Sequence, residues 1–370
     1  MSRELRPTER FPYHRHQRGS TTLELHDATS DSDDGLVVIP CLNEESCIFD
    51  VIGGVLRDPT ADKLLIVVAD GGSTDKTREI VTTLAQTTPN LRLMANPLRI
   101  QSAGVNLAAR HFGQGRQWLV RMDAHAEYPD GFISQLIAEA RRTRASSVVV
   151  AMKSQATGCF QKAAAVAQNT LLGTGGSAHR RDGAEGFVDH GHHALFRMAD
   201  FRALNGYDET QSHNEDAEFD CRLTRAGGRI WLTRVTRVGY YPRATLGDLY
   251  SQYRNYGRGR ATTILRHRAR PRLRQLLPAG VVPSLAPLLA TPWFTVAALP
   301  CTVWIAVCLT FGVFLGVRDR NRCAFASGFA AIVMHLGWSV GFWSALANIV
   351  STGGLRENTP SKKAPHELRT

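Results

Sequence analysis

Polar side chains stand where three short apolar runs of the chain end. Asn43, Asp70 and Asp123 each occupy such a position. Runs of this kind, alternating with helices, are typical of buried parallel strands, and parallel sheets bind their ligands at the carboxyl ends of the strands. We therefore expect these three side chains to lie at one ligand-binding edge.

The spacing of apolar residues predicts the strands and helices that must position these side chains. Continuous apolar runs predict strands at residues 36–39, 64–69, 91–94, 118–122 and 148–150. Spacing of i, i+3, i+4 predicts helices at residues 44–57, 76–86, 101–112 and 131–142. Strands alternating with helices predict an α/β domain whose mostly parallel sheet is covered on both faces. Beyond it we expect a loop region at 158–191, a helix at 215–225 and a strand at 229–238.

Two strand-to-helix loops carry the first specific motif. Residues 37–45 read V-V-I-P-C-L-N-E-E, and residues 70–77 read D-G-G-S-T-D-K-T. Each loop alone is compatible with a plain helix cap. The pair resembles the family 2 glycosyltransferases, which have a GT-A fold. The resemblance implies a nucleotide site formed by Pro40, Asn43, Glu44, Asp70, Ser73 and Asp75, with Asp70 reading the base.

The resemblance continues through Gln101, which would lie beside the donor, to R-M-D-A-H at residues 121–125. There Asp123 takes the place of the first carboxylate of the D-x-D metal motif, and His125 replaces the second. The implied cofactor is a divalent ion, Mn²⁺ or Mg²⁺, held against the donor diphosphate by Asp123 and His125. Imidazole favours Mn²⁺ over Mg²⁺. Alternatively, Asp123 alone carries the metal, and His125 contacts the phosphate or is structural.

Residues 213–219, H-N-E-D-A-E-F, resemble the E-D motif of the same family. An inverting transferase needs one base to take the proton of the acceptor hydroxyl. The resemblance assigns this role to Asp216, beside Glu215, and Asp220 is the near competitor. A charged, capped helix start is the structural alternative.

An acceptor-side segment is expected from H-G-H-H at residues 190–193, which includes His193. Residues 251–260 stand where processive synthases carry Q-x-x-R-W, although no Trp follows. Arg254 or Arg258 could grip a pyrophosphate or a lipid diphosphate. Membrane anchoring is the alternative role of these Arg residues.

The formal net charge of +11 is concentrated in an Arg-rich stretch between residues 254 and 274. Because an apolar region follows directly, this stretch is typical of a cytoplasmic membrane anchor, and we expect no nucleic-acid binding. The expected organisation is a disordered segment (1–34), a GT-A domain (35–250), a basic juxtamembrane segment (251–275), a transmembrane region (276–350) and a polar tail (351–370). The 7 scattered cysteines are expected to be buried thiols rather than a disulfide framework.

Residues 276–317 carry no charge, which is too long for one span of about 20 residues and fits two. A third span is expected at residues 323–350. The basic link at 318–322 and the catalytic domain would then be cytoplasmic, with the tail outside, in a multi-pass protein of the cell membrane. The first span contains Pro278, Pro283 and Pro287 and could be re-entrant instead.

Within this family, the residues of several motifs most resemble those of the succinoglycan-type exopolysaccharide glucosyltransferases. It implies an inverting transfer of glucose from UDP-glucose to a polyprenyl-diphosphate-linked saccharide, in exopolysaccharide or cell-envelope glycan synthesis. Two alternatives remain: a processive polysaccharide synthase and a non-catalytic nucleotide-binding membrane protein.

Overall fold

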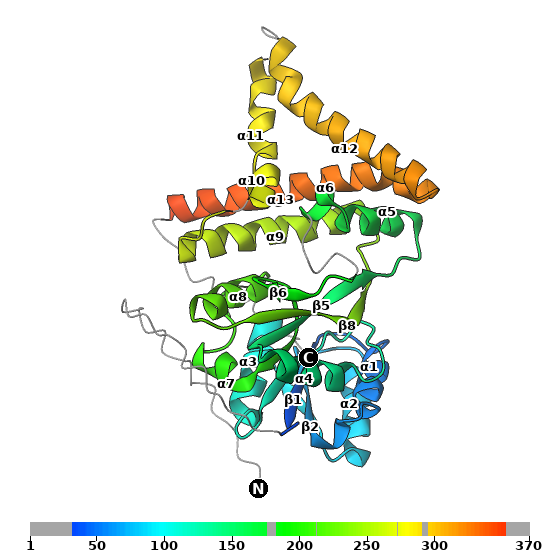
Figure 1. The fold of residues 1–370 in the computed structure, drawn as a ribbon, viewed down its shortest axis with the longest axis vertical. Coiled ribbons are helices and arrows are strands. Elements are labelled where there is room, and N and C mark those ends of the chain that lie inside the picture. The colour runs from blue at the N-terminus through cyan, green and yellow to red at the C-terminus, as the bar shows by residue number, and fades with distance from the viewer. Residues whose placement is uncertain (1–31, 176–182, 212, 272, 291–294, 353–370) are drawn as a thin grey trace, which may run out of the picture.

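A computed structural model describes residues 32–175, 183–211, 213–271, 273–290 and 295–352. An eight-stranded sheet in the order β3-β2-β1-β4-β7-β5-β8-β6 lies at the centre of the catalytic part (Figure 1). Its strands are β1 (Gly35–Cys41), β2 (Leu64–Asp70), β3 (Leu91–Ala95), β4 (Trp118–Arg121), β5 (Ser147–Ser154), β6 (Gly186–Val188), β7 (His192–Arg197) and β8 (Ile230–Tyr240). The segments 1–31 and 353–370, expected to be mostly disordered or a polar tail, lie outside the described residues.

The first half of the sheet is parallel, as predicted. β1 pairs with β2 and β4, and β2 pairs with β3, so that Cys41 lies opposite Asp70 at the carboxyl edge. Four helices follow these strands: α1 (Ile48–Leu56), α2 (Thr77–Thr87), α3 (Gln101–Phe112) and α4 (Phe132–Thr143). Alternate residues of β1 enter two different apolar clusters, Val37 one and Leu36 the other. Both faces of the sheet are therefore covered, which is why these strands are apolar throughout.

The second half of the sheet is mixed. β7 pairs antiparallel with β4 and β5, and β6 pairs antiparallel with β8. The helices here are α5 (Cys159–Gln168), α6 (Leu171–Thr174), α7 (Met198–Ala203) and α8 (Glu215–Arg225). A loop region was expected at 158–191, but α5 occupies its first part, because its run of small Ala residues packs against the C-terminal helices.

The C-terminal part is helical. Its helices are α9 (Leu246–His267), α10 (Leu273–Ala279), α11 (Val281–Leu285), α12 (Leu299–Arg318) and α13 (Ser327–Ser351). Short 3₁₀ helices lie at η1 (Ala61–Lys63), η3 (Ala286–Ala290), η4 (Thr295–Ala298) and η5 (Arg322–Ala326). The expected domain boundary at residue 250 falls inside α9.

Membrane-crossing helices are fewer than predicted. Within the described residues two segments, Thr295–Arg318 and Arg322–Ser351, are long and apolar enough to cross a membrane by length and composition. The first of the three expected spans is instead broken into α10, α11 and η3. Proline cannot donate a backbone hydrogen bond, so the prolines of this stretch interrupt a continuous helix.

The cysteine prediction was wrong for one pair. Cys159 in α5 and Cys323 in η5 form a disulfide across 164 residues of sequence. Cys41, Cys47, Cys221, Cys301 and Cys308 are free thiols. Sequence spacing could not reveal this pair, because only the tertiary fold brings η5 against α5.

Candidate active site

The loops that follow β1 and β2 hold each other through backbone hydrogen bonds. The N–H of Asn43 donates to Ser73 Oγ at 2.9 Å, and the N–H of Glu44 donates to Thr77 Oγ1 at 2.8 Å. In return the N–H of Thr74 donates to Asn43 Oδ1 at 2.8 Å. Asn43 has a φ of 58°, a left-handed conformation that Asn tolerates better than most residues. The two predicted nucleotide loops therefore form one surface.

The carboxylates of two acidic residues in the second loop accept hydrogen bonds from backbone N–H groups. Asp70 is 4% exposed, and its carboxylate accepts the N–H groups of Gly72 at 3.1 Å and Ser73 at 3.0 Å. Asp75 accepts the N–H of Glu45 at 3.1 Å, which ties the second loop to the first. These carboxylates therefore stabilise the two loops. The expected contact of Asp70 with a nucleotide base stays a prediction.

Arg121, at the end of β4, is the charged centre of the site. Its guanidinium contacts Asp216 Oδ1 at 2.6 Å, Glu215 Oε1 at 3.3 Å and Asp123 Oδ1 at 3.3 Å. It also donates to Gln101 Oε1 at 3.0 Å. Burial opposes its charge, but the carboxylates of Asp216 and Asp123 outweigh burial and raise the pKa of Arg121. One buried cation therefore joins the predicted metal motif to the predicted base.

Arg121 belongs to the R-M-D-A-H motif, but no functional role was predicted for it from the sequence. A signal was present, because Arg is rare in a fully buried strand unless it is paired. Its position two residues before Asp123 could have identified it as a partner for a carboxylate at the same edge.

Asp123 and His125 take different environments. Burial would raise the pKa of Asp123, but Arg121 outweighs it and the pKa is lowered, so the carboxylate is ionised. His192 Nε2 lies 3.7 Å from Asp123 Oδ2. His125 is mostly exposed, and its Nδ1 lies 2.9 Å from Glu44 Oε1.

A metal ion fits this edge only with help from a substrate. Among the residues that the structure describes, no cluster of three His, Cys, Asp or Glu could hold an ion. Mg²⁺ and Mn²⁺ commonly use one or two carboxylates plus the phosphate oxygens of a substrate, and ionised Asp123 suits that arrangement. The donor set thus supports a substrate-dependent ion rather than a closed protein site.

Glu215 and Asp216 begin α8, directly after Asn214, which has a φ of 63°. Burial, followed by the nearby charge of Asp216, raises the pKa of Glu215 to about 7. Asp216 lines the cavity described below, whereas Asp220 lies deeper and accepts from His190 Nδ1 at 2.7 Å. Of the two competing carboxylates, Asp216 is therefore the one open to a substrate.

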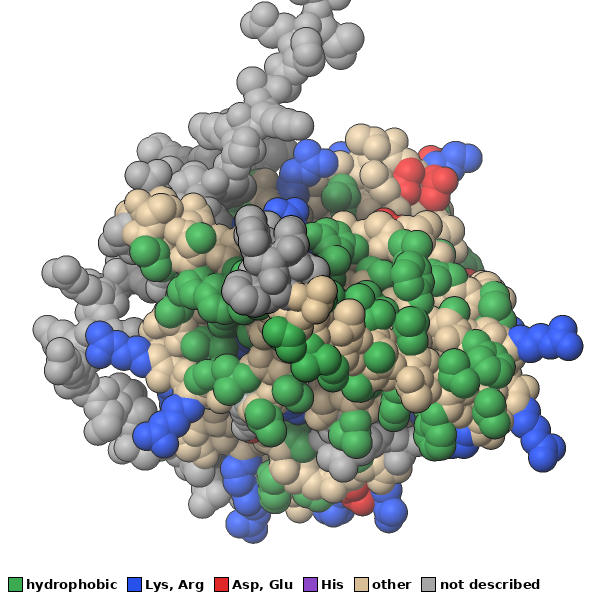
Figure 2. Space-filling view, turned by 90° about the horizontal axis from the view of Figure 1, so that it is seen from above, with side chains coloured by type: hydrophobic (Ala, Val, Ile, Leu, Met, Phe, Trp, Pro, Cys, Tyr) green, Lys and Arg blue, Asp and Glu red, His purple; other side chains and the backbone are tan. Residues whose placement is uncertain are grey.

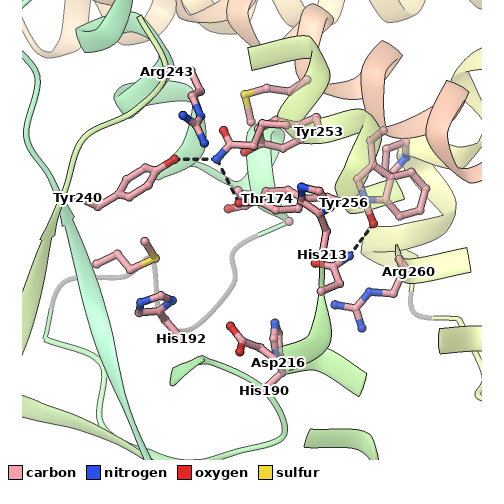
Figure 3. A pocket seen from close by; sticks show the side chains of 18 of the residues that line it. Thr174, His190, His192, His213, Asp216, Tyr240, Arg243, Tyr253, Tyr256 and Arg260 are labelled. Atoms are coloured by element: carbon pink, nitrogen blue, oxygen red, sulfur yellow. Dashed lines mark hydrogen bonds between the residues drawn. The ribbon is translucent and has the colours of Figure 1, made fainter. Parts of the chain in front are cut away.

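A cavity of about 1390 Å³ connects this charged cluster to the C-terminal helices. We call the cluster its floor: Gln101, Arg121, Asp123, Glu215 and Asp216. The roof consists of apolar side chains from α12 and α13: Trp304, Val307, Phe311, Met334 and Trp338. Figure 3 shows Asp216, His190 and His192 in the lower part of the cavity, with Tyr240, Arg243 and Tyr253 above them.

Polar side chains lie between floor and roof. Gln252 Nε2 donates to the hydroxyls of Tyr240 at 2.8 Å and Tyr256 at 3.2 Å. The cationic side chains of Arg243, Arg260 and Arg274 also line the cavity.

Two residues expected at the acceptor site are elsewhere. Arg254 and Arg258 are exposed on α9 and are not among the residues that line the cavity, whereas Arg260 is. Helical spacing explains the difference, because Arg260 shares a face with Tyr253 and Tyr256. The side chain of His193 lies outside the described part of the chain, and its neighbour His192 lines the cavity.

The other predicted residues divide in two groups. Gln101, Asp123, His125, Glu215 and Asp216 all line the cavity. The cavity lining does not include the members of the nucleotide loops: Pro40, Asn43, Glu44, Asp70, Ser73 and Asp75. His125 connects the groups through its contact with Glu44.

Comparison with known proteins places this geometry in a family. Residues 36–204 match Glycosyl transferase family 2, and residues 159–317 match Glycosyl transferase family group 2. The chain is 50% identical over 317 residues to the succinoglycan biosynthesis protein ExoA of Rhizobium meliloti (strain 1021), covering 85% of this chain and 96% of that protein.

One solved structure supports the GT-A-like fold. A mannosyltransferase from Pyrobaculum calidifontis, in complex with GDP-Man and Mn²⁺, has a TM-score of 0.53 and 19% identity, covering 82% of this chain and 86% of its own. TarS 1–349 of S. aureus has a TM-score of 0.45 and 13% identity, covering 85% and 92%. The identity to ExoA over most of both chains shows that this protein is a glycosyltransferase of family 2, with a GT-A-like α/β domain.

Proposed function

We propose that this enzyme transfers glucose from UDP-glucose, with inversion, to a lipid-linked saccharide in exopolysaccharide or cell-envelope glycan synthesis. The observation that carries the proposal is the cavity, which has Asp123 and Asp216 on its charged floor and an apolar roof made by candidate membrane helices. A sugar nucleotide and a lipid-linked acceptor require these two kinds of surface.

On the donor side, the nucleotide would lie along the two linked loops, with its sugar directed into the cavity at Gln101. Asp123, ionised by its contact with Arg121, would hold a divalent ion together with the donor phosphates, and His125 is placed to assist through Glu44. When bound, such an ion supplies positive charge that stabilises the leaving diphosphate.

On the acceptor side, Asp216 would accept the proton of the attacking hydroxyl. The hydroxyl oxygen forms a bond to the anomeric carbon while the bond from that carbon to the diphosphate breaks, so UDP leaves and the configuration inverts. Arg121 holds Asp216 at 2.6 Å and keeps the carboxylate oriented. General-base catalysis of this kind is worth about 10²–10⁴-fold in rate.

The lipid would enter from the roof. Arg243, Arg260 and Arg274 line the cavity, and they would bind the charge of a polyprenyl diphosphate. Arg forms strong hydrogen bonds with phosphate oxygens. Because nucleotide sugars are cytoplasmic metabolites, the catalytic domain would face the cytoplasm at the inner leaflet of the cell membrane.

A donor screen tests the proposal. Purified protein is incubated with UDP-glucose, UDP-galactose, GDP-mannose and a polyprenyl-diphosphate saccharide, with Mn²⁺, with Mg²⁺ or with excess EDTA. We expect transfer of one glucose from UDP-glucose, a β-linkage by NMR, and loss of activity in EDTA. A long polymer would favour a processive synthase, and an α-linkage would contradict the assignment of Asp216 as base.

A further inference from the structure

Helix α13 lies lengthwise on α9, with their backbones in contact. A Cβ at Gly341 would overlap the carbonyl oxygen of Arg254, and a Cβ at Gly337 would lie 2.6 Å from the carbonyl oxygen of Tyr250. On the facing helix, a Cβ at Gly257 would overlap the carbonyl oxygen of Trp338. Glycine at these three positions lets the helices approach more closely than larger residues would allow.

α9 belongs to the catalytic domain and cannot move into lipid. Asn214 Nδ2 donates to the carbonyl oxygen of Tyr256 at 2.7 Å, and His267 Nε2 lies 2.8 Å from Glu218 Oε1. Arg254 and Arg258 are exposed on α9. A charged side chain at the centre of a bilayer is costly, so α9 must stay in water or among head groups.

α13 is attached to the catalytic side at further points. His335 Nε2 lies 2.6 Å from the carbonyl oxygen of Leu172 in α6. Ala330 and Ala331 pack with Ala164 of α5, and the disulfide Cys159–Cys323 holds the segment just before α13. A helix bound along its length to α5, α6 and α9 follows the direction of α9 (Figure 1).

Most of the surface of α12, unlike that of α13, is not packed against other helices. Its side chains Val303, Val307, Val313 and Phe314 are each at least 50% exposed. α10 and α11 lead away from the plane of α9 and α13, and α12 leads back to it, with η3 and η4 at the far end (Figure 1).

Seen from above, apolar side chains cover this end of the molecule, and Lys and Arg side chains lie around its edge (Figure 2). Exposed apolar residues include Leu277 on α10, Phe329 and Trp343 on α13, and Phe314 on α12. Arg318, Arg320 and Arg322, at the return of the hairpin, are also exposed. An apolar face with a cationic edge matches a bilayer that contains anionic lipid.

We propose that α10, α11 and α12 form a hairpin that enters the bilayer from the side of the catalytic domain and returns to it, while α13 lies along the membrane surface without crossing. Trp343 and Phe329 of α13 would rest at the lipid interface. The chain at Ser351 then stays on the same side as the catalytic domain, contrary to the three-span expectation. This inference rests on the cytoplasmic location of the catalytic domain in the proposed function, but not on the identity of the acceptor.

Reporter fusions to the C-terminus of the full chain test it. Green fluorescent protein is fluorescent only in the cytoplasm, and alkaline phosphatase is active only outside. We expect a fluorescent first fusion and an inactive second one. Active phosphatase with no fluorescence would overturn the proposal.

Cysteine labelling gives a second, independent measurement. Val350→Cys is compared with Arg320→Cys, whose position is on the catalytic side in the proposed topology and in the three-span one, and with the unsubstituted protein as background. A membrane-impermeant maleimide should label both variants only after the cells are permeabilised. Labelling of Val350→Cys but not Arg320→Cys in intact cells would show that α13 crosses the membrane. Labelling of Arg320→Cys alone in intact cells would show that α12 and α13 both cross the membrane, and would also overturn the proposal.

Discussion

The floor and the roof of the cavity carry opposite kinds of side chain. The floor buries charge: Arg121 and Glu215 are each less than 10% exposed, and Arg121 contacts three carboxylates. The roof belongs to helices whose outer surfaces expose apolar side chains, including Phe314 at 53%. A buried charge must be paired, and an exposed apolar surface must be covered. The floor therefore suits ionic chemistry, and the roof suits the lipid-linked acceptor that we propose.

The largest effect should come from the floor. Asp216→Asn keeps the size of the side chain but removes the base, so we expect kcat to fall by about 10²–10⁴-fold. UDP binding by calorimetry should change little, and Asp130→Asn, an exposed carboxylate, should leave kcat unchanged. A near-normal kcat for Asp216→Asn would move the base to another carboxylate and remove the chemical role of the floor.

Arg121 tests whether the floor acts as one unit. Removing one partner from a buried ionic cluster costs about 3–5 kcal/mol, so Arg121→Met should be less stable. Among the molecules that fold, kcat should fall, and the acid limb of the pH–rate profile should move to higher pH because the carboxylates lose their cation.

Arg121→Lys keeps the charge but loses the forked geometry. It should restore the pH profile and recover only part of kcat. A variant that loses stability without a shift of the profile would reduce Arg121 to a structural role.

Glu215 should make the free energy of unfolding depend on pH. Its pKa is about 7 in the folded protein against an ordinary 4.5, so the folded state holds a proton that the unfolded state loses. The free energy of unfolding should then fall as pH rises from about 4.5 to 7, by about 1–3 kcal/mol. Glu215→Gln should lack this fall when melting temperatures are measured in detergent at pH 5 and 7.5. Parallel curves for the two proteins would contradict the buried, protonated Glu215.

The roof should give the smallest and most selective effect. Phe311→Ala removes an apolar wall of the cavity, so KM for a long-chain lipid acceptor should rise by about 5–10-fold. KM for a short-chain acceptor should stay the same. Phe314→Ala, on the same helix but outside the cavity lining, is the matched control. Equal effects of both substitutions on both acceptors would indicate general damage to α12 and not a lipid contact.

The sequence determined the parallel half of the sheet and its helices, because continuous apolar runs and helical spacing are local signals. The predicted helices at 101–112 and 215–225 coincide with α3 and α8. The motifs also singled out Asp123 and Asp216 as candidate site residues. These features depend on residues close together in the chain, so local patterns contain enough information to reveal them.

Only the tertiary structure decided how distant segments meet. Arg121 and Asp216 are 95 residues apart, and the pairing of Cys159 with Cys323 spans 164. α12 and α13 both lie in segments long and apolar enough to cross a membrane, but α13 packs on α9 because Gly337 and Gly341 face a helix that only folding brings there. Apolar composition indicates that a helix must be covered, and the fold determines whether protein or lipid covers it.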